Sequence, residues 1–354
     1  MPGSNYGKIF KITTFGESHG EALGVVIDGV PAGFELSLEK IQLEMDRRKP
    51  GQSDATTPRK ESDTIKCLSG FFQGKTTGTP LTLVLFNGNT RSQDYGDIVE
   101  KFRPGHGDWT YFKKYNGHRD WRGGGRSSGR ETAARTAAGA VAKQLLQTMG
   151  VEIQAYTKEA GGIECTQYIR EEIEKNPMRA CDPVAAEKMM VKLHELMKEH
   201  NSMGGIVECR ITNLPPGLGE PVFDKLDAEL AKAIFSLGTV KGFEIGSGFA
   251  AAKMTGKEQN DERDKNGFLS NNAGGIIAGI SSGQDIVFRA AIKPTPSISI
   301  EQKTMDINNN ETTLVTHGRH DPCICPRIVP VIEAMTAIVL MDMVLLQKRN
   351  EFVK

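Results

Sequence analysis

The sequence predicts a mixed α/β chain in which helices and strands alternate along the whole length. Helices are indicated by capping residues at their ends, and short apolar runs bounded by glycine or proline are typical of strands. The chain has 354 residues, 38% of them hydrophobic, enough for one large globular unit or two ordinary domains. No repeat, low-complexity tract or proline-rich linker marks a domain boundary, so the pattern alone leaves the domain count open.

Five helices and several strands are predicted. Ser37 can cap the first helix, which Pro50 stops, and Asp182 followed by Pro183 starts the third. The helical segments are Leu38 to about Arg48, Glu131 to Met149, Pro183 to Asn201, Pro221 to Phe235 and Pro330 to Lys348. The strands are Leu23 to Ile27, Leu81 to Phe86, Gly205 to Ile211, Phe243 to Ile245 and Ile286 to Ile292. The polar stretch Lys257 to Lys265 is interpreted as an exposed loop.

Charge and cysteine content exclude several classes of protein. The 44 Lys and Arg balance 44 Asp and Glu, which removes the electrostatic argument for a general nucleic-acid or membrane-surface binder. Six scattered cysteines and the absence of a signal-like opening favour free thiols in the cytoplasm. Cys323 and Cys325 lack a second Cys or His pair at zinc-ligand spacing, so no metal site is predicted.

One long apolar run, Val329 to Leu346, needs an interpretation. It carries Glu333 and Asp342, whose burial in hydrocarbon would be costly. We therefore interpret it as a buried or interface helix and predict no membrane span.

The 39 glycines gather in polar clusters suited to phosphate-binding loops, although ordinary turns would also explain them. Two clusters match known motifs only in part. Gly246 to Ala251 follows a strand, but the sequence then turns polar where a dinucleotide fingerprint needs a helix. Gly70 to Thr76 is one residue short of a P-loop and is interpreted as a hairpin.

Three segments combine a histidine or acid with glycine and arginine. The first is Gly16-Glu17-Ser18-His19-Gly20, directly before an apolar strand. A histidine between serine and glycine is better suited to display in a cleft than to packing, and imidazole can give a proton to a departing group. An ordinary loop histidine would fit the same pattern.

The second segment runs from Arg103 to Arg135 and contains His106 and the loop Gly123-Gly124-Gly125-Arg126. Eight Lys or Arg face three Asp or Glu here, in a chain whose net charge is zero. The loop leads into the Glu131 helix, so backbone N–H groups, a helix dipole and guanidiniums would converge on one anion such as phosphate. A solvated basic face is the alternative.

The third segment, His317-Gly318-Arg319-His320-Asp321-Pro322, precedes the last helix. A carboxylate between cationic groups stays ionised, which suits a base or an orienting group. A surface salt-bridge cluster would give the same pattern.

Together these segments resemble the signature regions of the chorismate synthase family, in the family's order and at its separations. The likeness extends to Arg47 through Ser53, Arg103 through His106, Ser270 through Gly275 and Lys293 through Ser297, and spans nearly the whole chain. The resemblance implies one domain over residues 1–354, a β-α-β layered sandwich with helices between antiparallel sheets, and assembly as a homotetramer.

The resemblance also implies conversion of 5-enolpyruvylshikimate 3-phosphate to chorismate by anti-1,4-elimination of phosphate with reduced FMN. His19 would protonate the leaving phosphate, His106 would stabilise charge on the flavin, and Asp321 would assist removal of the ring proton. Ser18, His19, Arg48 and Arg130 would bind the substrate. The implied flavin positions are Arg126, Ser127, Ser128, Gly238, Thr239, Ala278, Lys293, Pro294, Thr295, Pro296, Ser297 and Arg319.

Several matters stay open at this point. Asp54 stands where many family members have a second arginine, so either Arg59 or a neighbouring chain replaces it, or substrate affinity is lower than usual in the family. NADPH or an external flavin reductase could reduce the flavin. A flavin-dependent oxidoreductase acting on an anionic substrate is the alternative enzyme, and an RNA-binding protein using Arg119 to Arg130 as an RGG-like segment is the non-enzymatic one.

Overall fold

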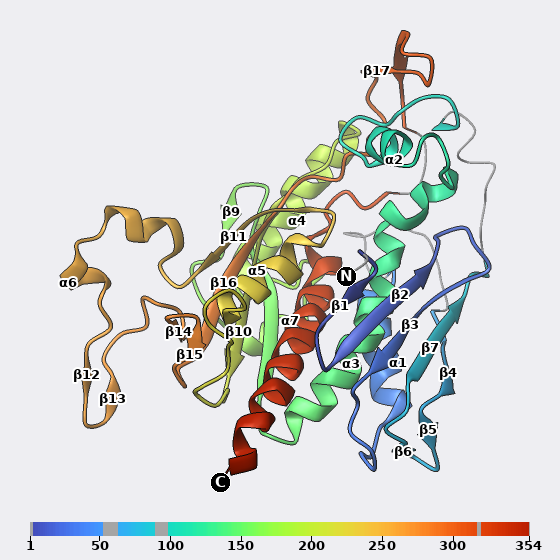
Figure 1. The fold of residues 1–354 in the computed structure, drawn as a ribbon. Coiled ribbons are helices and arrows are strands. Elements are labelled where there is room, and N and C mark those ends of the chain that lie inside the picture. Colours follow the sequence, from blue (N-terminus) through green and yellow to red (C-terminus); the bar gives the residue numbers. More distant parts are fainter. Residues whose placement is uncertain (1–2, 52–62, 89–97, 317–319, 354) are drawn as a thin grey trace.

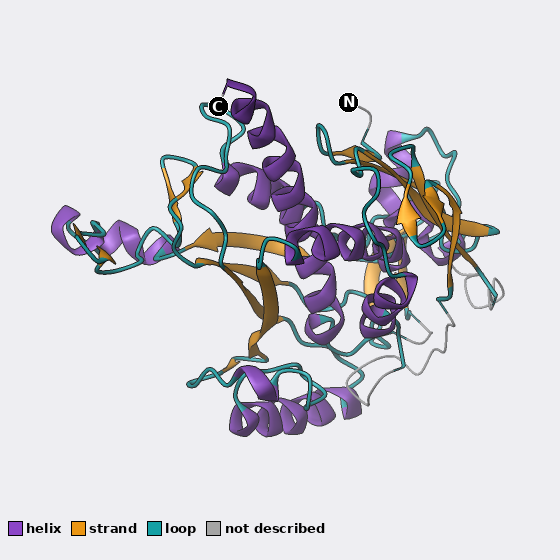
Figure 2. Cartoon of the chain, turned by 90° about the horizontal axis from the view of Figure 1, so that it is seen from below, coloured by secondary structure: helices purple, strands orange, loops and turns teal. Residues whose placement is uncertain are grey.

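The computed structural model describes residues 3–51, 63–88, 98–316 and 320–353. Two five-stranded antiparallel sheets enclose a layer of helices, as the resemblance implied (Figures 1 and 2). The first sheet, in the order β1-β2-β3-β7-β4, consists of Asn5–Tyr6, Lys11–Gly16, Ala22–Asp28, Leu81–Phe86 and Ile65–Ser69. The second, in the order β11-β16-β10-β8-β9, consists of Val240–Ile245, Ile286–Ile292, Gly205–Thr212, Glu152–Ala160 and Ile163–Glu164.

Helices and short hairpins complete the described part of the fold. The α-helices are α1 Leu38–Arg48, α2 Asp108–Lys114, α3 Thr132–Gln147, α4 Pro183–Lys198, α5 Leu226–Phe235, α6 Gly256–Gln259 and α7 Cys325–Lys348. The 3₁₀ turns are η2 Arg122–Ser127, η3 Gly129–Glu131, η4 Arg170–Glu172, η5 Gly248–Lys253 and η6 Arg349–Val353. The hairpin strands are β5 Phe71–Phe72, β6 Lys75–Thr76, β12 Arg263–Asp264, β13 Gly267–Phe268, β14 Ile276–Ile277, β15 Ile280–Ser281, β17 Gln302–Met305 and β18 Glu311–Leu314.

The middle layer is built around α3 and α7, which pack against each other. Helix α3 contacts β2, β3 and β7 of the first sheet, and α7 contacts β8 and β10 of the second, so each sheet has its own helix (Figure 1). Buried apolar residues of both sheets and both helices form one continuous core. The alanine-rich face of α3 permits a close approach: a methyl group at Gly139 would lie 2.3 Å from Cβ of Ala334 on α7.

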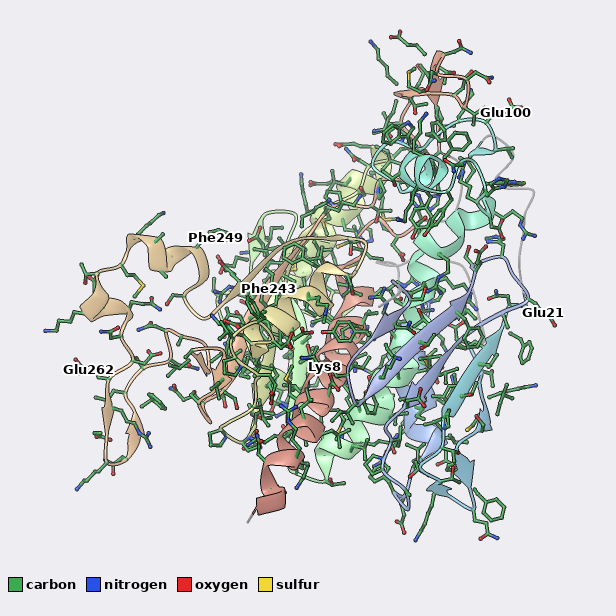
Figure 3. The ribbon with its side chains drawn as sticks, in the orientation of Figure 1. Lys8, Glu21, Glu100, Phe243, Phe249 and Glu262 are labelled. Atoms are coloured by element: carbon green, nitrogen blue, oxygen red, sulfur yellow. The ribbon has the colours of Figure 1, made fainter. Side chains whose placement is uncertain are left out.

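Helix α7 is the apolar run of the sequence, and it is buried inside the fold. It is the one described helix long and apolar enough to cross a membrane, and 94% of its apolar stretch is buried. The carboxylate of Asp342 accepts hydrogen bonds from the backbone N–H groups of Lys8, Ile9 and Phe10, at 2.9, 2.7 and 3.0 Å. Figure 3 shows Lys8 beside this helix. The charge is therefore compensated by the chain itself.

The other buried carboxylate of α7, Glu333, connects three helices of the middle layer to the second sheet. It pairs with Arg47 at the end of α1 at 2.6 Å and with Lys143 of α3 at 2.5 Å, and accepts the N–H of Ala155 in β8 at 3.0 Å. Burial raises its pKa, but Arg47 and Lys143 outweigh that effect and hold the pKa well below its usual value.

The five predicted helices and five predicted strands are all present, but two helix starts were wrong. Helix α7 begins at Cys325, five residues before the predicted Pro330, which therefore lies inside the helix. Proline cannot donate to the carbonyl four residues earlier. Here that carbonyl, of Pro326, accepts a hydrogen bond from Nη1 of Arg179 at 2.6 Å, which replaces the missing donor.

Helix α5 begins later than predicted. Residues 220–224 form a turn closed by a hydrogen bond from the N–H of Glu220 to the carbonyl of Asp224 at 3.0 Å, so α5 starts only at Leu226.

The two glycine clusters that match known motifs only in part have the structures expected from the sequence. Strands β5 and β6 form the predicted hairpin, and β11 is followed by the 3₁₀ turn η5 rather than by a dinucleotide-binding helix. The polar stretch after η5 lies on an arm that projects from the body, on which Figure 3 labels Phe249 and Glu262.

We predict that Gly139→Ala destabilises the protein, because the added methyl group meets both Cβ and the backbone of Ala334 and forces α3 and α7 apart. Overpacking of this kind costs about 1–3 kcal/mol. Urea denaturation followed by circular dichroism should show a lower midpoint with an unchanged slope.

The matched control is Gly256→Ala, at an exposed position in α6 with no atom within 4 Å of the new methyl group. It should leave the midpoint unchanged or raise it slightly. Equal midpoints for the Gly139 variant and the wild type would contradict the close packing of α3 on α7.

Candidate active site

A cavity of about 510 Å³ lies at the amino-terminal ends of α3 and α7. Seven cationic side chains and two carboxylates line it, namely Arg48, Arg103, Arg126, Arg130, Arg135, Lys293 and Arg327 against Glu131 and Asp321. Like charges in a confined space repel one another, and the two helix N-termini add positive potential. An anionic ligand of small-molecule size therefore stabilises this wall.

The glycine loop forms one side of the cavity. Gly123, Gly124 and Gly125 have φ values of 59°, 86° and 52°. Residues other than glycine rarely adopt such positive φ values. The loop continues through the turn Gly129–Glu131 into α3, as the sequence predicted. Consecutive left-handed residues press the backbone of the loop against the side chains around it.

The loop brings His19 and His106 to neighbouring positions. A methyl group at Gly123 would lie 2.2 Å from Cε1 of His19, and one at Gly124 would lie 2.9 Å from Cε1 of His106. His106 lines the cavity, whereas His19 and Ser18 lie behind Gly123, which lines it. The side chains of Ser18 and His19 are both buried, and Oγ of Ser18 is 3.1 Å from Nδ1 of His19. Two histidines far apart in the sequence thus meet across one loop.

A buried ion pair orients His106. Nδ1 of His106 lies 3.0 Å from Nη2 of Arg103 and 3.1 Å from Oδ1 of Asp108. Asp108 also accepts from Nε and Nη2 of Arg103 at 2.7 and 2.8 Å. Burial lowers the pKa of His106, and Arg103 and Lys293 lower it further against the opposing effect of Asp108. At neutral pH the imidazole is therefore uncharged.

Arg48 and Arg130 share one buried carboxylate. Oδ2 of Asp63 accepts from Nη2 of Arg48 at 2.7 Å, and Oδ1 accepts from Nη1 of Arg130 at 2.8 Å. Burial lowers the pKa of Arg48 to about 10, which Asp63 counteracts, so its guanidinium is still charged at neutral pH. Burial raises the pKa of Asp63, but the two guanidiniums outweigh it and lower the value.

Asp321 also lines the cavity and lies four residues before the start of α7. Its carboxylate pairs with Nη1 of Arg327 in the first turn of that helix. Nε of Arg327 also donates to the backbone carbonyl of Arg48 at 3.4 Å. Asp321, His106, Arg48 and Arg130 therefore all line one cavity.

The positions implied for flavin binding are mostly, but not all, in this cavity. Arg126, Ser127, Ser128, Gly238, Thr239, Lys293, Thr295, Pro296 and Ser297 line it. Pro294 is in the same segment but is not among the lining residues, and Ala278 lies elsewhere, in the turn between β14 and β15. Arg319, Asp54 and Arg59 lie outside the described residues.

The arginines of the basic segment are engaged by groups of the chain itself. Arg126 donates to the carbonyl of Gly16 and to Thr14 in β2, Arg122 pairs with Asp120, and Arg119 donates to the carbonyl of Ile98. An RGG-like segment would keep its arginines available for an external strand. Here they hold the loop in place.

Sequence reasoning missed the residues that hold the site together. Asp63, Asp108, Arg327 and Asn87 each fix a proposed functional side chain. Asp108 had a usable signal, two residues after His106, whereas nothing near Asp63 in the sequence indicates a buried partner for two arginines.

The comparisons with known proteins agree over nearly the whole chain. A model of the chorismate synthase family matches residues 10–345. The chorismate synthase of Syntrophobacter fumaroxidans is 56% identical over 345 residues, which cover 98% of both chains. That of Methanosarcina mazei is 53% identical, covering 97% of this chain and 96% of the relative. A solved structure described as a crystal structure of chorismate synthase is 32% identical, with a TM-score of 0.77, covering 97% of this chain and 93% of that one. The chain belongs to the chorismate synthase family.

Proposed function

We propose that this protein converts 5-enolpyruvylshikimate 3-phosphate to chorismate and phosphate, using reduced FMN. The observation that carries the proposal is the cavity itself: a wall of seven cations that contains His106 and Asp321 and abuts His19 through one glycine. A substrate with a phosphate and two carboxylates suits such a wall. Family membership supports the reaction, and the geometry supports the assignment of residues below.

Arg48 and Arg130, which line the cavity, and Ser18, which lies behind Gly123, would hold the substrate's anionic groups. Arg48 and Arg130 are both buried, so their attraction for an anion is weakly screened by solvent. Nε of Arg48 is buried without a hydrogen-bond partner among the described residues and is therefore a donor available to a ligand.

Three residues handle charge and protons. His19 gives a proton to the leaving phosphate, since it lies beside the cationic loop that would hold this group. Asp321, which lines the same cavity, takes part in removing the ring proton. His106 is neutral in the free protein because of its burial near Arg103 and Lys293, so it would offer a hydrogen bond to the flavin's pyrimidine end without adding a further positive charge before a ligand binds.

The residues present fit a flavin. The hydroxyl oxygens of Thr239 and Thr295 are buried in the cavity wall and have no hydrogen-bond partner in the part of the chain that is described. With Lys293, Ser127 and the backbone of Gly238, they would hold the cofactor. The chemistry that reduced FMN would supply there is transient electron donation to the substrate as phosphate departs, returned by the end of the reaction, so that the overall reaction would be redox-neutral.

Further assignments follow the family. Residues 1–354 would act as one domain, which the single continuous core supports. A cytoplasmic location is supported by the six cysteines, none of which forms a disulfide. The flavin's reductant, NADPH or a separate flavin reductase, is not assigned.

A stoichiometry measurement separates this function from that of a flavin-dependent oxidoreductase. In an anaerobic assay with reduced FMN and the enolpyruvyl phosphate, phosphate and chorismate should form in equal amounts while reductant is not consumed. A redox-neutral elimination needs only a catalytic quantity of reduced flavin. Oxidation of one equivalent of reductant per phosphate released would instead support the oxidoreductase.

Replacement of His106 tests its proposed role. His106→Ala should keep the fold and lose most of the turnover with reduced FMN, about 100-fold or more, as is usual when a positioned acid–base or charge-stabilising group is removed. Steady-state rates and circular dichroism measure the two properties. His118→Ala, in the same segment but outside this cavity, is the matched control and should retain activity. Wild-type turnover in the His106 variant would remove this residue from the mechanism.

The position of Ala278 supports the proposed homotetramer. If Ala278 contacts a flavin, as the family implies, another subunit must supply it, because it does not line the cavity of its own chain. Native mass spectrometry should give the mass of four copies. A monomer that is fully active at assay concentration would rule out both the assembly and this contact.

A further inference from the structure

We propose that Asp63 is a positioning residue for substrate binding, which fixes Arg48 and Arg130 as a rigid pair of guanidiniums facing the cavity. The proposal rests on the proposed function only for the identity of the anion. Asp63 does not line the cavity, and its side chain is fully buried, so it acts through the two arginines.

The geometry distinguishes this carboxylate from an ordinary salt bridge. Each of its oxygens accepts from a different arginine, at 2.7 and 2.8 Å, and the three side chains come from different parts of the chain. Arg48 ends α1, Asp63 precedes β4, and Arg130 lies in the turn before α3. The side chains of Arg48 and Arg130 are only 2% and 6% exposed, so solvent does little to reduce their mutual repulsion.

Two further donors of the pair are also fixed. Nε of Arg130 donates to Oδ1 of Asn87 at 2.7 Å, and Nη1 of Arg48 lies 3.3 Å from the hydroxyl of Thr132. With these donors committed, Nε of Arg48 is left without a partner among the described residues, inside the wall of the cavity. A fixed array with one buried donor available is a pre-organised anion site.

The same network reaches the loop that carries His19. The side-chain amide of Asn87 donates to the carbonyls of Glu17 and Gly20 at 3.1 and 2.8 Å. At the other end, Arg327 connects the carbonyl of Arg48 to Asp321. Asp63 therefore lies in the middle of one polar chain that joins the two ends of the site.

Replacing Asp63 by Asn separates positioning from simple charge. Loss of a negative charge makes the cavity more positive, so long-range attraction alone would tighten anion binding. If Asp63 positions the arginines, they separate in Asp63→Asn and binding weakens. The two effects have opposite signs, so a binding measurement distinguishes them.

For Asp63→Asn we expect the KM of the enolpyruvyl phosphate to rise about tenfold, the size of one lost charge-assisted hydrogen bond. The kcat at saturation and the Kd of FMN should change less than about threefold, since Asp63 touches neither ligand. Binding of inorganic phosphate, measured by thermal shift, should weaken in parallel without any turnover. An unchanged or lower KM, or an equal loss of FMN affinity, would overturn the proposal.

Two further variants keep the test decisive. Glu333→Gln is the matched control, because Glu333 is equally buried and also bridges two cations, but lies outside this cavity. It should lower stability without raising the KM. If Asp63→Asn does not fold, Asn87→Ala should raise the KM in the same direction by about threefold, because Arg130 loses one anchor. An unchanged KM there would also overturn the proposal.

The phosphate measurement separates this inference from the proposed function. If wild-type protein forms no chorismate but Asp63→Asn still binds inorganic phosphate more weakly, the function fails and the positioning role stands. If chorismate forms and phosphate binding is unaffected by the substitution, the positioning role fails and the function stands.

Discussion

The carboxylate of Asp63 is the point on which the cationic site depends. Arg48 and Arg130 are buried and lie close enough to share it, and in its absence their repulsion would have no internal compensation. One carboxylate for two guanidiniums leaves net positive charge in the wall. The same few side chains therefore form stabilising ion pairs and attract an anion. A substitution among them changes both the stability of the protein and its affinity for the anion.

Elsewhere in the fold, too, buried charges have partners within the chain. Glu333 and Asp342 lie in an apolar helix, yet each carboxylate is satisfied by cations or by backbone N–H groups. These contacts attach α7 to α1, α3 and the first strands. Because α3 and α7 are held together at Gly139, their amino-terminal ends meet at one place, and the cavity forms there. The position of the site is thus a consequence of how the middle layer packs.

Short sequence patterns predicted those helices and loops whose ends are set by neighbouring residues. Ser37 and Pro50 bracket α1 as expected, and the glycine loop leads into α3 as its sequence indicated. The site beyond these segments could not be predicted from local patterns, because it depends on long-range partners. Asp63 bonds to residues 15 and 67 positions away, and Pro330 is tolerated in α7 only because Arg179 reaches the carbonyl of Pro326. The resemblance supplied the residues proposed to react, but not the carboxylates that hold the residues of the site.

The neutral state of His106 follows from the same excess of positive charge. Its imidazole is buried beside Arg103 and Lys293, so protonation would add a cation where several already repel one another. Asp108 opposes this effect but is itself engaged by Arg103 through both oxygens. An anion that enters the cavity reduces the repulsion and makes protonation of His106 less costly. Ligand charge and the protonation of His106 are therefore coupled by electrostatics. The histidine is uncharged in the free protein and gains basicity as negative charge accumulates beside it, which is when a proton or a hydrogen bond is needed there.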